Sequence, residues 1–262
     1  EEGMTMNRLL SAGRAARRIM LTAFGAAALY AGAATAPVTA EPLDYFLKDG
    51  VRYNPSVLKP SDVLGHALGD QATRHDQMVD YIRQLAAGSE RMHIETIGYS
   101  HERRPILFLT VSSPENLARI DEIREAHLAS LESGAAPAAD LPAIVWLNYG
   151  VHGAEASGMD AAIPTLYHLA AAEGREIEGQ LENAVLLVTA VFNPDGHNRR
   201  ADWVTNYMSD VTATNPDHEI HNQAWPGGRT NHYWFDLNRQ WLLQTQPESR
   251  AWLAAWHRWK PQ

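Results

Sequence analysis

The sequence predicts an α/β fold with a mixed, mainly parallel central sheet and helices on both faces. Two near-continuous apolar runs, 143–148 and 184–192, are typical of strands that are covered on both faces. An alanine-rich helical pattern, 159–172, separates them. A strand, a helix and a second strand in this order favour parallel pairing with a right-handed crossover.

The first forty residues differ from the rest of the chain. Four arginines precede an alanine-rich apolar stretch, 19–34, and small residues follow at 37–40. This order is typical of a secretory signal peptide. A membrane anchor is the alternative, but the apolar run is short and rich in Ala and Gly. We therefore predict a signal peptide over 1–40, export to the periplasm or the exterior, and no stable membrane span after cleavage.

The elements before the first apolar run follow from their own patterns. Apolar positions at helical spacing predict a helix over 75–87. Alternation over 92–97, a polar turn and a second apolar segment over 105–111 predict a hairpin at one side of the sheet. A charged amphipathic pattern predicts a further helix over 117–131.

Beyond the second apolar run, residues 193–236 show little periodic pattern, and a long irregular segment inside a compact domain is usually functional. Aromatic and hydrogen-bonding side chains are dense over 225–239. A last helix is predicted over 247–259, with Pro247 at a favourable first position. No repeat or linker interrupts 41–262, which we interpret as one domain.

Composition excludes several classes of function. The chain has 262 residues, of which 45% are hydrophobic and 20% are charged, as in ordinary globular proteins. A net charge of −9 argues against nucleic-acid binding. The absence of cysteine excludes disulfides, thiol catalysis and thiolate metal ligands. A bound metal ion must therefore use His, Asp or Glu.

One pair of side chains suits a metal ion. His152 and Glu155 follow the strand 143–148, and only the small residues Gly153 and Ala154 separate them. The imidazole and the carboxylate can therefore converge on one point. Zinc accepts nitrogen and oxygen ligands, and three protein ligands with one open position make a catalytic site. A lone histidine after a strand is more often a structural residue, but the nearby carboxylate favours zinc binding.

Three short motifs resemble those of the zinc carboxypeptidases (funnelins). They occur in the order of that family, from about Leu43 to the end of the chain. Each motif alone is a weak signal, and the second is equally compatible with a simple turn. Together they are specific: His152-Gly153-Ala154-Glu155, Asn193-Pro194-Asp195-Gly196 and Asp236-Leu237-Asn238-Arg239.

The resemblance implies a role for each matching residue. His152 and Glu155 would be the first two ligands of Zn²⁺. Arg229 would polarise the scissile carbonyl and stabilise the oxyanion, with Arg199 and Arg200 as alternatives for that role.

The resemblance also implies a substrate. Asn238 and Arg239 would hold the free C-terminal carboxylate of a peptide, for which the planar guanidinium is well suited. The expected activity is that of a zinc metallocarboxypeptidase, which hydrolyses the C-terminal peptide bond. A zinc deacylase or amidase acting on small acyl-amino acids or cell-wall peptides is one alternative. A non-catalytic peptide-binding protein is the other.

The resemblance further requires a third zinc ligand, a histidine, and a glutamate general base. We identify neither in the sequence, and His257 lies within the predicted last helix. We therefore expect 41–262 to be the N-terminal portion of a catalytic domain and this chain alone to be inactive.

Overall fold

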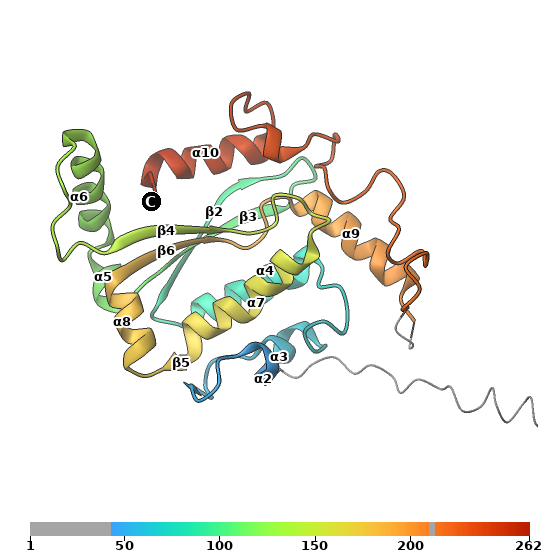
Figure 1. The fold of residues 1–262 in the computed structure, drawn as a ribbon, viewed down its shortest axis with the longest axis horizontal. Coiled ribbons are helices and arrows are strands. Elements are labelled where there is room, and N and C mark those ends of the chain that lie inside the picture. Colours follow the sequence, from blue (N-terminus) through green and yellow to red (C-terminus); the bar gives the residue numbers. More distant parts are fainter. Residues whose placement is uncertain (1–42, 210–212) are drawn as a thin grey trace, which may run out of the picture. The chain divides into compact units, whose positions relative to one another are not determined.

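A four-stranded sheet lies at the centre of the part of the chain that the computed structural model describes, residues 43–209 and 213–262 (Figure 1). The strand order is β2-β3-β6-β4. The strands are β2 (Met92–Tyr99), β3 (Pro105–Val111), β4 (Ala143–Asn148) and β6 (Ala184–Thr189). The predicted signal peptide, 1–40, lies outside the described residues.

The prediction of a mainly parallel sheet is wrong. Only β4 and β6, the two apolar runs, pair in parallel, whereas β2 with β3 and β3 with β6 pair antiparallel. The physical reason is that a run of apolar residues indicates that a strand is buried but does not indicate whether it runs parallel or antiparallel to its neighbours. Strand β3 is apolar because both of its faces are covered, although Leu109 pairs with Val188 in antiparallel register.

Helices cover both faces of the sheet, as predicted. On one face lie α4 (His75–Ala87) and α7 (Ala156–Ala171), and on the other α6 (Ile120–Ser133) and α10 (Pro247–Trp259) (Figure 1). Successive side chains of a strand point to opposite faces. Leu107 and Leu109 therefore join the cluster that includes α4 and α7, while Phe108 packs with Trp259 of α10.

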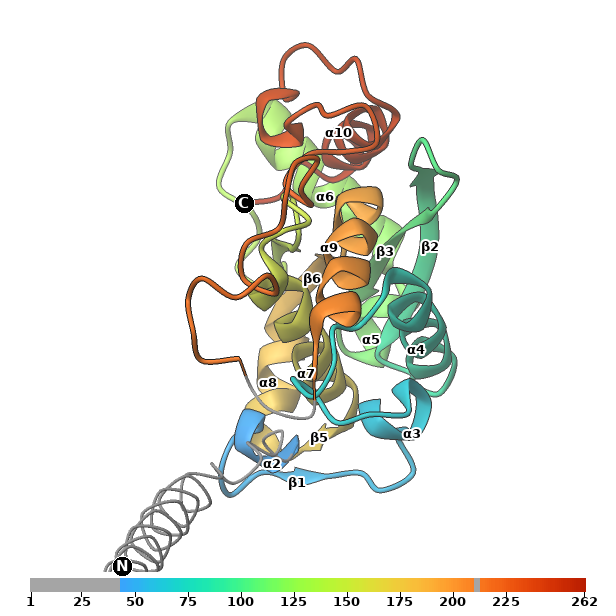
Figure 2. The same ribbon diagram turned by 90° about the vertical axis from the view of Figure 1, so that its right-hand side faces the viewer.

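The remaining elements are short or lie at the periphery. They are α2 (Leu43–Phe46), β1 (Arg52–Tyr53), α3 (Pro60–Leu64), α5 (Pro114–Ala118), β5 (Ala172–Glu173), α8 (Arg175–Asn183), α9 (Pro194–Tyr207) and the 3-10 turn η2 (Leu237–Arg239). Strands β1 and β5 form a separate antiparallel pair. Helix α9 packs against α4 (Figure 2).

Most predicted boundaries agree with the structure, and 75–87, 105–111, 143–148 and 247–259 coincide with α4, β3, β4 and α10. The predicted helix over 117–131 is interrupted at Arg119, between α5 and α6. Nothing in the sequence patterns indicated α8.

The prediction of irregular structure after β6 is wrong for α9. Asn193 caps this helix, because its side chain accepts a hydrogen bond from the backbone N–H of Gly196 at 3.0 Å, and Pro194 occupies the first turn. Besides Pro194, the first turn buries the polar side chains of Asp195 and His197. A helix that buries polar groups shows no apolar stripe, so periodicity could not reveal it.

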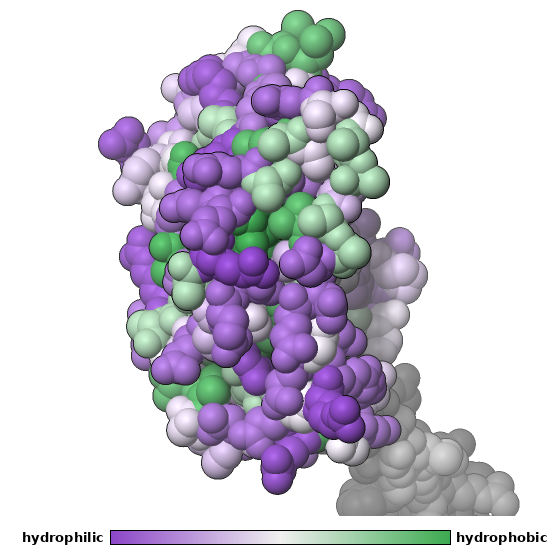
Figure 3. All heavy atoms as spheres, turned by 90° about the vertical axis from the view of Figure 1, so that its left-hand side faces the viewer, coloured by the Kyte–Doolittle hydropathy of each residue, from purple (hydrophilic) through white to green (hydrophobic). Residues whose placement is uncertain are grey.

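The surface is largely hydrophilic on the face shown in Figure 3, where apolar side chains are exposed in smaller areas between polar ones. This distribution is normal for a globular protein. Among the helices of 43–209 and 213–262 we find no candidate membrane span.

Two buried histidines tie α4 and α9 to neighbouring loops. The Nε2–H of His75 donates to the carbonyl of Pro105 at 3.1 Å, and that of His197 donates to the carbonyl of Thr73 at 2.8 Å. Burial lowers the pKa of His75 to about 3 and that of His197 to about 4. Both histidines are therefore neutral in the folded protein at pH 7.

We expect the free energy of unfolding to fall as the pH is lowered from about 6.5 towards 4. Both folded-state pKa values lie below the value of about 6.5 in an unfolded chain, so protonation favours unfolding. Between pH 7 and pH 4.5, the decrease in the free energy of unfolding should be about 2–3 kcal/mol smaller for His197→Gln than for the unsubstituted protein, as measured by denaturant titration. The exposed His257→Gln serves as control, and equal losses in both variants would contradict the prediction.

Candidate metal centre

The turn that carries His152 and Glu155 connects the end of β4 to the start of α7. Two backbone hydrogen bonds hold the start of this turn beside the chain that follows β6. Tyr149 N–H donates to the carbonyl of Thr189, and Asn193 N–H donates to the carbonyl of Gly150 at 3.0 Å. Gly150 has a φ of 69°, a left-handed conformation that glycine adopts without a steric penalty. The turn therefore lies at the carboxyl ends of the two parallel strands, where ligands bind in such sheets.

His152 is 7% exposed and lies between two carboxylates. Its Nδ1 is 2.9 Å from Oε1 of Glu155, and its Nε2 is 2.9 Å from Oδ1 of Asp236. A neutral imidazole has one N–H and can donate to only one of them. If Nε2–H donates to Asp236, the Nδ1 lone pair and the Glu155 oxygen face a common point. A zinc ion at that point would accept both donors, so the two residues fit the group that the sequence predicts.

Asp236 connects this pair to a second segment of the chain. Besides His152, it accepts hydrogen bonds from the backbone N–H of Asn238 at 2.9 Å and from Nη2 of Arg229 at 2.9 Å. Partial burial raises the pKa of Asp236, but these three hydrogen bonds outweigh that effect and hold the pKa below its usual range. The carboxylate is therefore ionised and orients the imidazole.

Arg229 lies beside the candidate metal ligands. Its Nη2 contacts Asp236, and its Nη1 is 4.0 Å from Oε1 of Glu155. The two alternative arginines point elsewhere: Arg199 donates to the carbonyl of Gly227 at 2.9 Å, and Arg200 donates to the carbonyl of Ile220 at 3.2 Å. The structure thus brings Arg229 to the His152–Glu155 pair and gives Arg199 and Arg200 backbone contacts instead.

Asn238 and Arg239 follow Asp236 in η2, and both are exposed. The side-chain oxygen of Asn238 accepts a hydrogen bond from Nε1 of Trp241 at 2.9 Å. Among the residues that the structure describes, Arg239 contacts only the carbonyl of Asn238, at 3.3 Å, and no carboxylate. Its positive charge is therefore available to a ligand.

Three glycines hold the segments of the site together. A Cβ added to Gly153 would lie 2.1 Å from the backbone nitrogen of His197, and one added to Gly196 would lie 2.3 Å from the carbonyl oxygen of Gly228. A Cβ on Gly228 would lie 2.6 Å from the carbonyl oxygen of Gly196. The turns that carry His152, Asn193 and Arg229 therefore pack backbone against backbone, which only glycine permits.

Asn193 adds a hydrogen bond to this packing, since its Nδ2 donates to the carbonyl of Arg229 at 3.2 Å. Within the described residues, no group of three or more His, Asp or Glu side chains forms a metal site. Three other histidines of the described chain have partners of their own: Nδ1 of His218 accepts from the backbone N–H of Ile220, Nε2 of His221 donates to the carbonyl of Ala213, and Nδ1 of His232 lies 2.9 Å from Glu102.

The sequence patterns did not indicate the contact between His152 and Asp236, because the two residues are 84 positions apart. They also did not indicate the roles of Ser100, Glu102, Arg104 and Asp195, which contact one another beside the site. The polar turn between two apolar strands was the available signal for Ser100, Glu102 and Arg104, and the motif Asn193-Pro194-Asp195-Gly196 was the signal for Asp195.

A comparison with protein families supports the resemblance. The family model for zinc carboxypeptidase matches residues 78–257. The chain therefore belongs to the zinc carboxypeptidase family. A comparison with curated proteins found no match.

Several solved structures are similar to parts of the chain. Thrombin activatable fibrinolysis inhibitor has 13% identity and a TM-score of 0.41, and the match covers 76% of this chain and 48% of that one. Carboxypeptidase A from Helicoverpa armigera has 13% identity and a TM-score of 0.42, with coverages of 75% and 47%. A metallo-carboxypeptidase from Burkholderia cenocepacia has 18% identity and a TM-score of 0.36, with coverages of 64% and 33%. The chain thus spans between a third and a half of the length of these structures.

Proposed function

We propose that the protein is a zinc-dependent metallocarboxypeptidase that hydrolyses the C-terminal peptide bond of peptides with a free carboxylate. One observation carries this proposal. Asp236 contacts His152 and Arg229 at 2.9 Å each, so the candidate metal ligand and the candidate oxyanion-binding arginine share one carboxylate. Arg239, three residues after Asp236, makes no ion pair among the described residues and could bind the carboxylate of a substrate.

His152 and Glu155 would hold the zinc ion. Bound zinc would polarise the substrate carbonyl and lower the pKa of a water molecule. With Nε2–H donating to Asp236, Nδ1 would keep its lone pair for the metal ion, and the carboxylate would orient the ring. The family also requires a third ligand and a general base, and among the described residues no group of three or more His, Asp or Glu side chains could hold a metal ion.

Arg229 would donate to the carbonyl oxygen of the scissile bond as negative charge develops there. Its Nη2 is held by Asp236, while its Nη1 lies 4.0 Å from Glu155 and the side chain is half exposed, so the guanidinium would reach a substrate beside the metal ligands. Arg239 would bind the terminal carboxylate through its planar fork, with Asn238 beside it. This pair would restrict cleavage to the last peptide bond. The predicted leader would export the protein.

Replacing Arg239 tests the substrate. For a peptide with a free C-terminus, Arg239→Ala should reduce kcat/KM by about tenfold to a hundredfold, mainly through KM, because a charged hydrogen bond is lost. The same variant should act on a C-terminally amidated peptide as the natural protein does. The exposed Arg83→Ala on α4 is the matched control, and both are measured in the full-length protein.

Other outcomes of this experiment identify other functions. An equal loss on both peptides would contradict a carboxylate-binding role for Arg239. Hydrolysis restricted to acyl-amino acids or cell-wall peptides would indicate the zinc deacylase or amidase. Binding of peptides without turnover would indicate the non-catalytic peptide-binding protein.

A further inference from the structure

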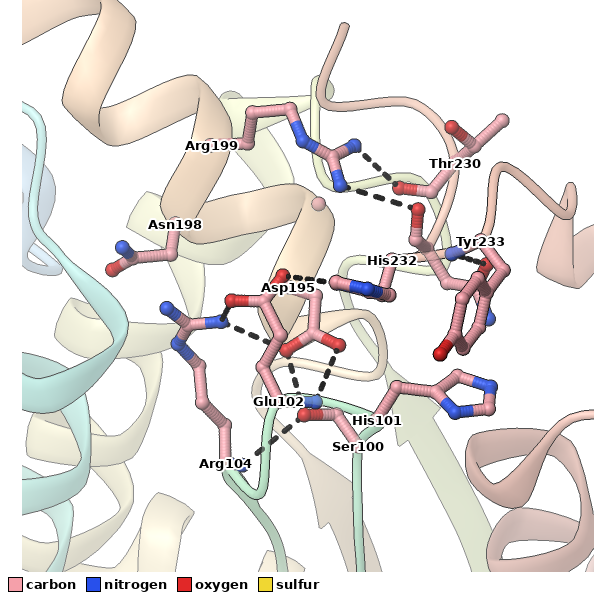
Figure 4. Close-up of polar contacts among 12 residues, drawn as sticks. Ser100, His101, Glu102, Arg104, Asp195, Asn198, Arg199, Thr230, His232 and Tyr233 are labelled. Carbon is pink, nitrogen blue, oxygen red and sulfur yellow. Dashed lines mark hydrogen bonds and ion pairs between the residues drawn. The ribbon is translucent and has the colours of Figure 1, made fainter. Parts of the chain in front are cut away.

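The site loop, residues 225–240, carries both Arg229 and Asp236 and is held in place by a polar network outside the candidate metal centre. Figure 4 shows this network, in which side chains from the turn between β2 and β3 and from α9 point towards the site loop. Its members are Ser100, Glu102, Arg104, Asp195, Arg199 and His232.

Asp195 is the buried residue of the network that accepts the most hydrogen bonds. Its side chain is fully buried and accepts hydrogen bonds from Ser100 Oγ at 2.6 Å, from the backbone N–H of Glu102 at 3.2 Å and from Nη1 of Arg104 at 2.9 Å. A buried carboxylate with three donors is well satisfied. The turn between β2 and β3 is therefore fastened to the first turn of α9, next to Gly196.

Glu102 extends from this fastened turn to the site loop. Its Oε1 is 2.9 Å from Nδ1 of His232, and its other oxygen contacts the guanidinium of Arg104. Partial burial raises the pKa of Glu102, but the hydrogen bonds from His232 and Arg104 outweigh this effect and hold the pKa below its usual range. Asp195 of α9 holds the turn between β2 and β3, and the ionised carboxylate of Glu102 in this turn contacts His232. His232 lies between Arg229 and Asp236 in the sequence.

Arg199 holds the same loop from the other side. It donates to the carbonyl of Gly227 at 2.9 Å. It also donates to the carbonyls of Thr230 at 3.4 Å and Asn231 at 3.3 Å, and Figure 4 shows its guanidinium directed at Thr230. Arg199 thus restrains the backbone around Arg229, whereas Glu102 is the contact that reaches His232. Both contacts restrain the segment from Arg229 to Asp236, together with the hydrogen bonds that the buried Asn231 makes to Gln246 and Glu248.

We propose that Glu102 is a positioning residue for the candidate metal centre and that it acts through His232. By fixing the segment 229–236, it would keep Asp236 on Nε2 of His152 and Arg229 beside Glu155. Loss of such supporting contacts typically costs tenfold to a hundredfold in metal affinity or activity. The catalytic part of the inference rests on the proposed function, whereas the positional part does not.

The contact between Glu102 and His232 is suited to a test because a half-exposed contact of this kind contributes little to overall stability. The side chains of Glu102 and His232 are 33% and 41% exposed, and pairs of this kind have small effects on unfolding. A matched control lies on the same hairpin. Glu95 of β2 pairs with Arg258, with exposures of 44% and 39%, and does not touch the site loop.

The experiment compares Glu102→Gln with Glu95→Gln in the full-length protein. We expect Glu102→Gln to weaken zinc affinity, measured by chelator competition, by about threefold to tenfold and to lower kcat about tenfold with little change in KM. Amide hydrogen exchange of 231–239 should become faster, while the unfolding midpoint stays unchanged. Glu95→Gln should leave all five quantities unchanged.

A double-mutant cycle tests the path through His232. His232→Asn places an amide donor where Nδ1 lies and should retain most of the affinity, whereas His232→Ala should not. In the His232→Ala background, Glu102→Gln should have no further effect. Additive losses, or a Glu102→Gln variant identical to Glu95→Gln in exchange and zinc affinity, would overturn the inference. A protein that binds zinc but cleaves no peptide would overturn the proposed function alone.

Discussion

Gly153→Ala is expected to destabilise the folded protein by about 3 kcal/mol or more and to weaken zinc binding together with it. The new methyl group would lie 2.1 Å from the backbone nitrogen of His197 and 2.2 Å from the carbonyl carbon of Gly196. Both are backbone atoms, so no side chain can rotate away. The turn that carries His152 would therefore have to move. Denaturant unfolding and chelator competition measure the two effects.

Gly158→Ala is the matched control for this prediction. Gly158 lies in the first turns of α7, and among the described residues no atom outside the helix lies within 4 Å of an added Cβ. Alanine in a helix interior is favoured over glycine by about 0.5–1 kcal/mol, so this variant should be equally or more stable. If Gly153→Ala behaved like Gly158→Ala, the close packing of the three turns would be disproved.

His152→Ala is expected to abolish zinc binding in the full-length protein, because it removes the only nitrogen ligand that we assign. Asp236→Asn should instead weaken the affinity about tenfold to a hundredfold, since it alters the partner of the ligand and not the ligand itself. Metal content after dialysis and chelator competition distinguish total from partial loss. The exposed His257→Ala on α10 should retain the full metal content.

Unchanged metal content in His152→Ala would refute the zinc assignment. Equal loss in His152→Ala and Asp236→Asn would show that Asp236 does more than orient the imidazole. Both results would require a different arrangement of the candidate metal centre, while the membership of the family would stand.

The fold was predictable where local pattern and burial coincide. The stripe of α4 and the apolar runs of β4 and β6 carry their own signal, because each buries a regular set of apolar side chains. Strand direction is not encoded in that way, so the antiparallel pairing of β3 with β6 was missed. Helix α9 was missed because Asp195 and His197 occupy its buried face.

The residues of the candidate site could be named from the sequence, but their contacts could not. His152 and Glu155 were identified from the sequence because a metal pair at this spacing requires only one turn of chain. Arg229, Asn238 and Arg239 were named through the resemblance to the family. Their surroundings depend on contacts between distant segments.

The sequence by itself determined most elements and predicted the candidate ligands, since both depend on neighbouring residues. Only the tertiary structure decided that Asp236 contacts His152 across 84 positions and that Glu102 contacts His232 across 130. A hydrogen bond requires its two atoms to lie about 3 Å apart in space, and the distance between two residues along the chain does not indicate whether they meet. Backbone packing at Gly153, Gly196 and Gly228 likewise becomes visible only when the three turns are brought together.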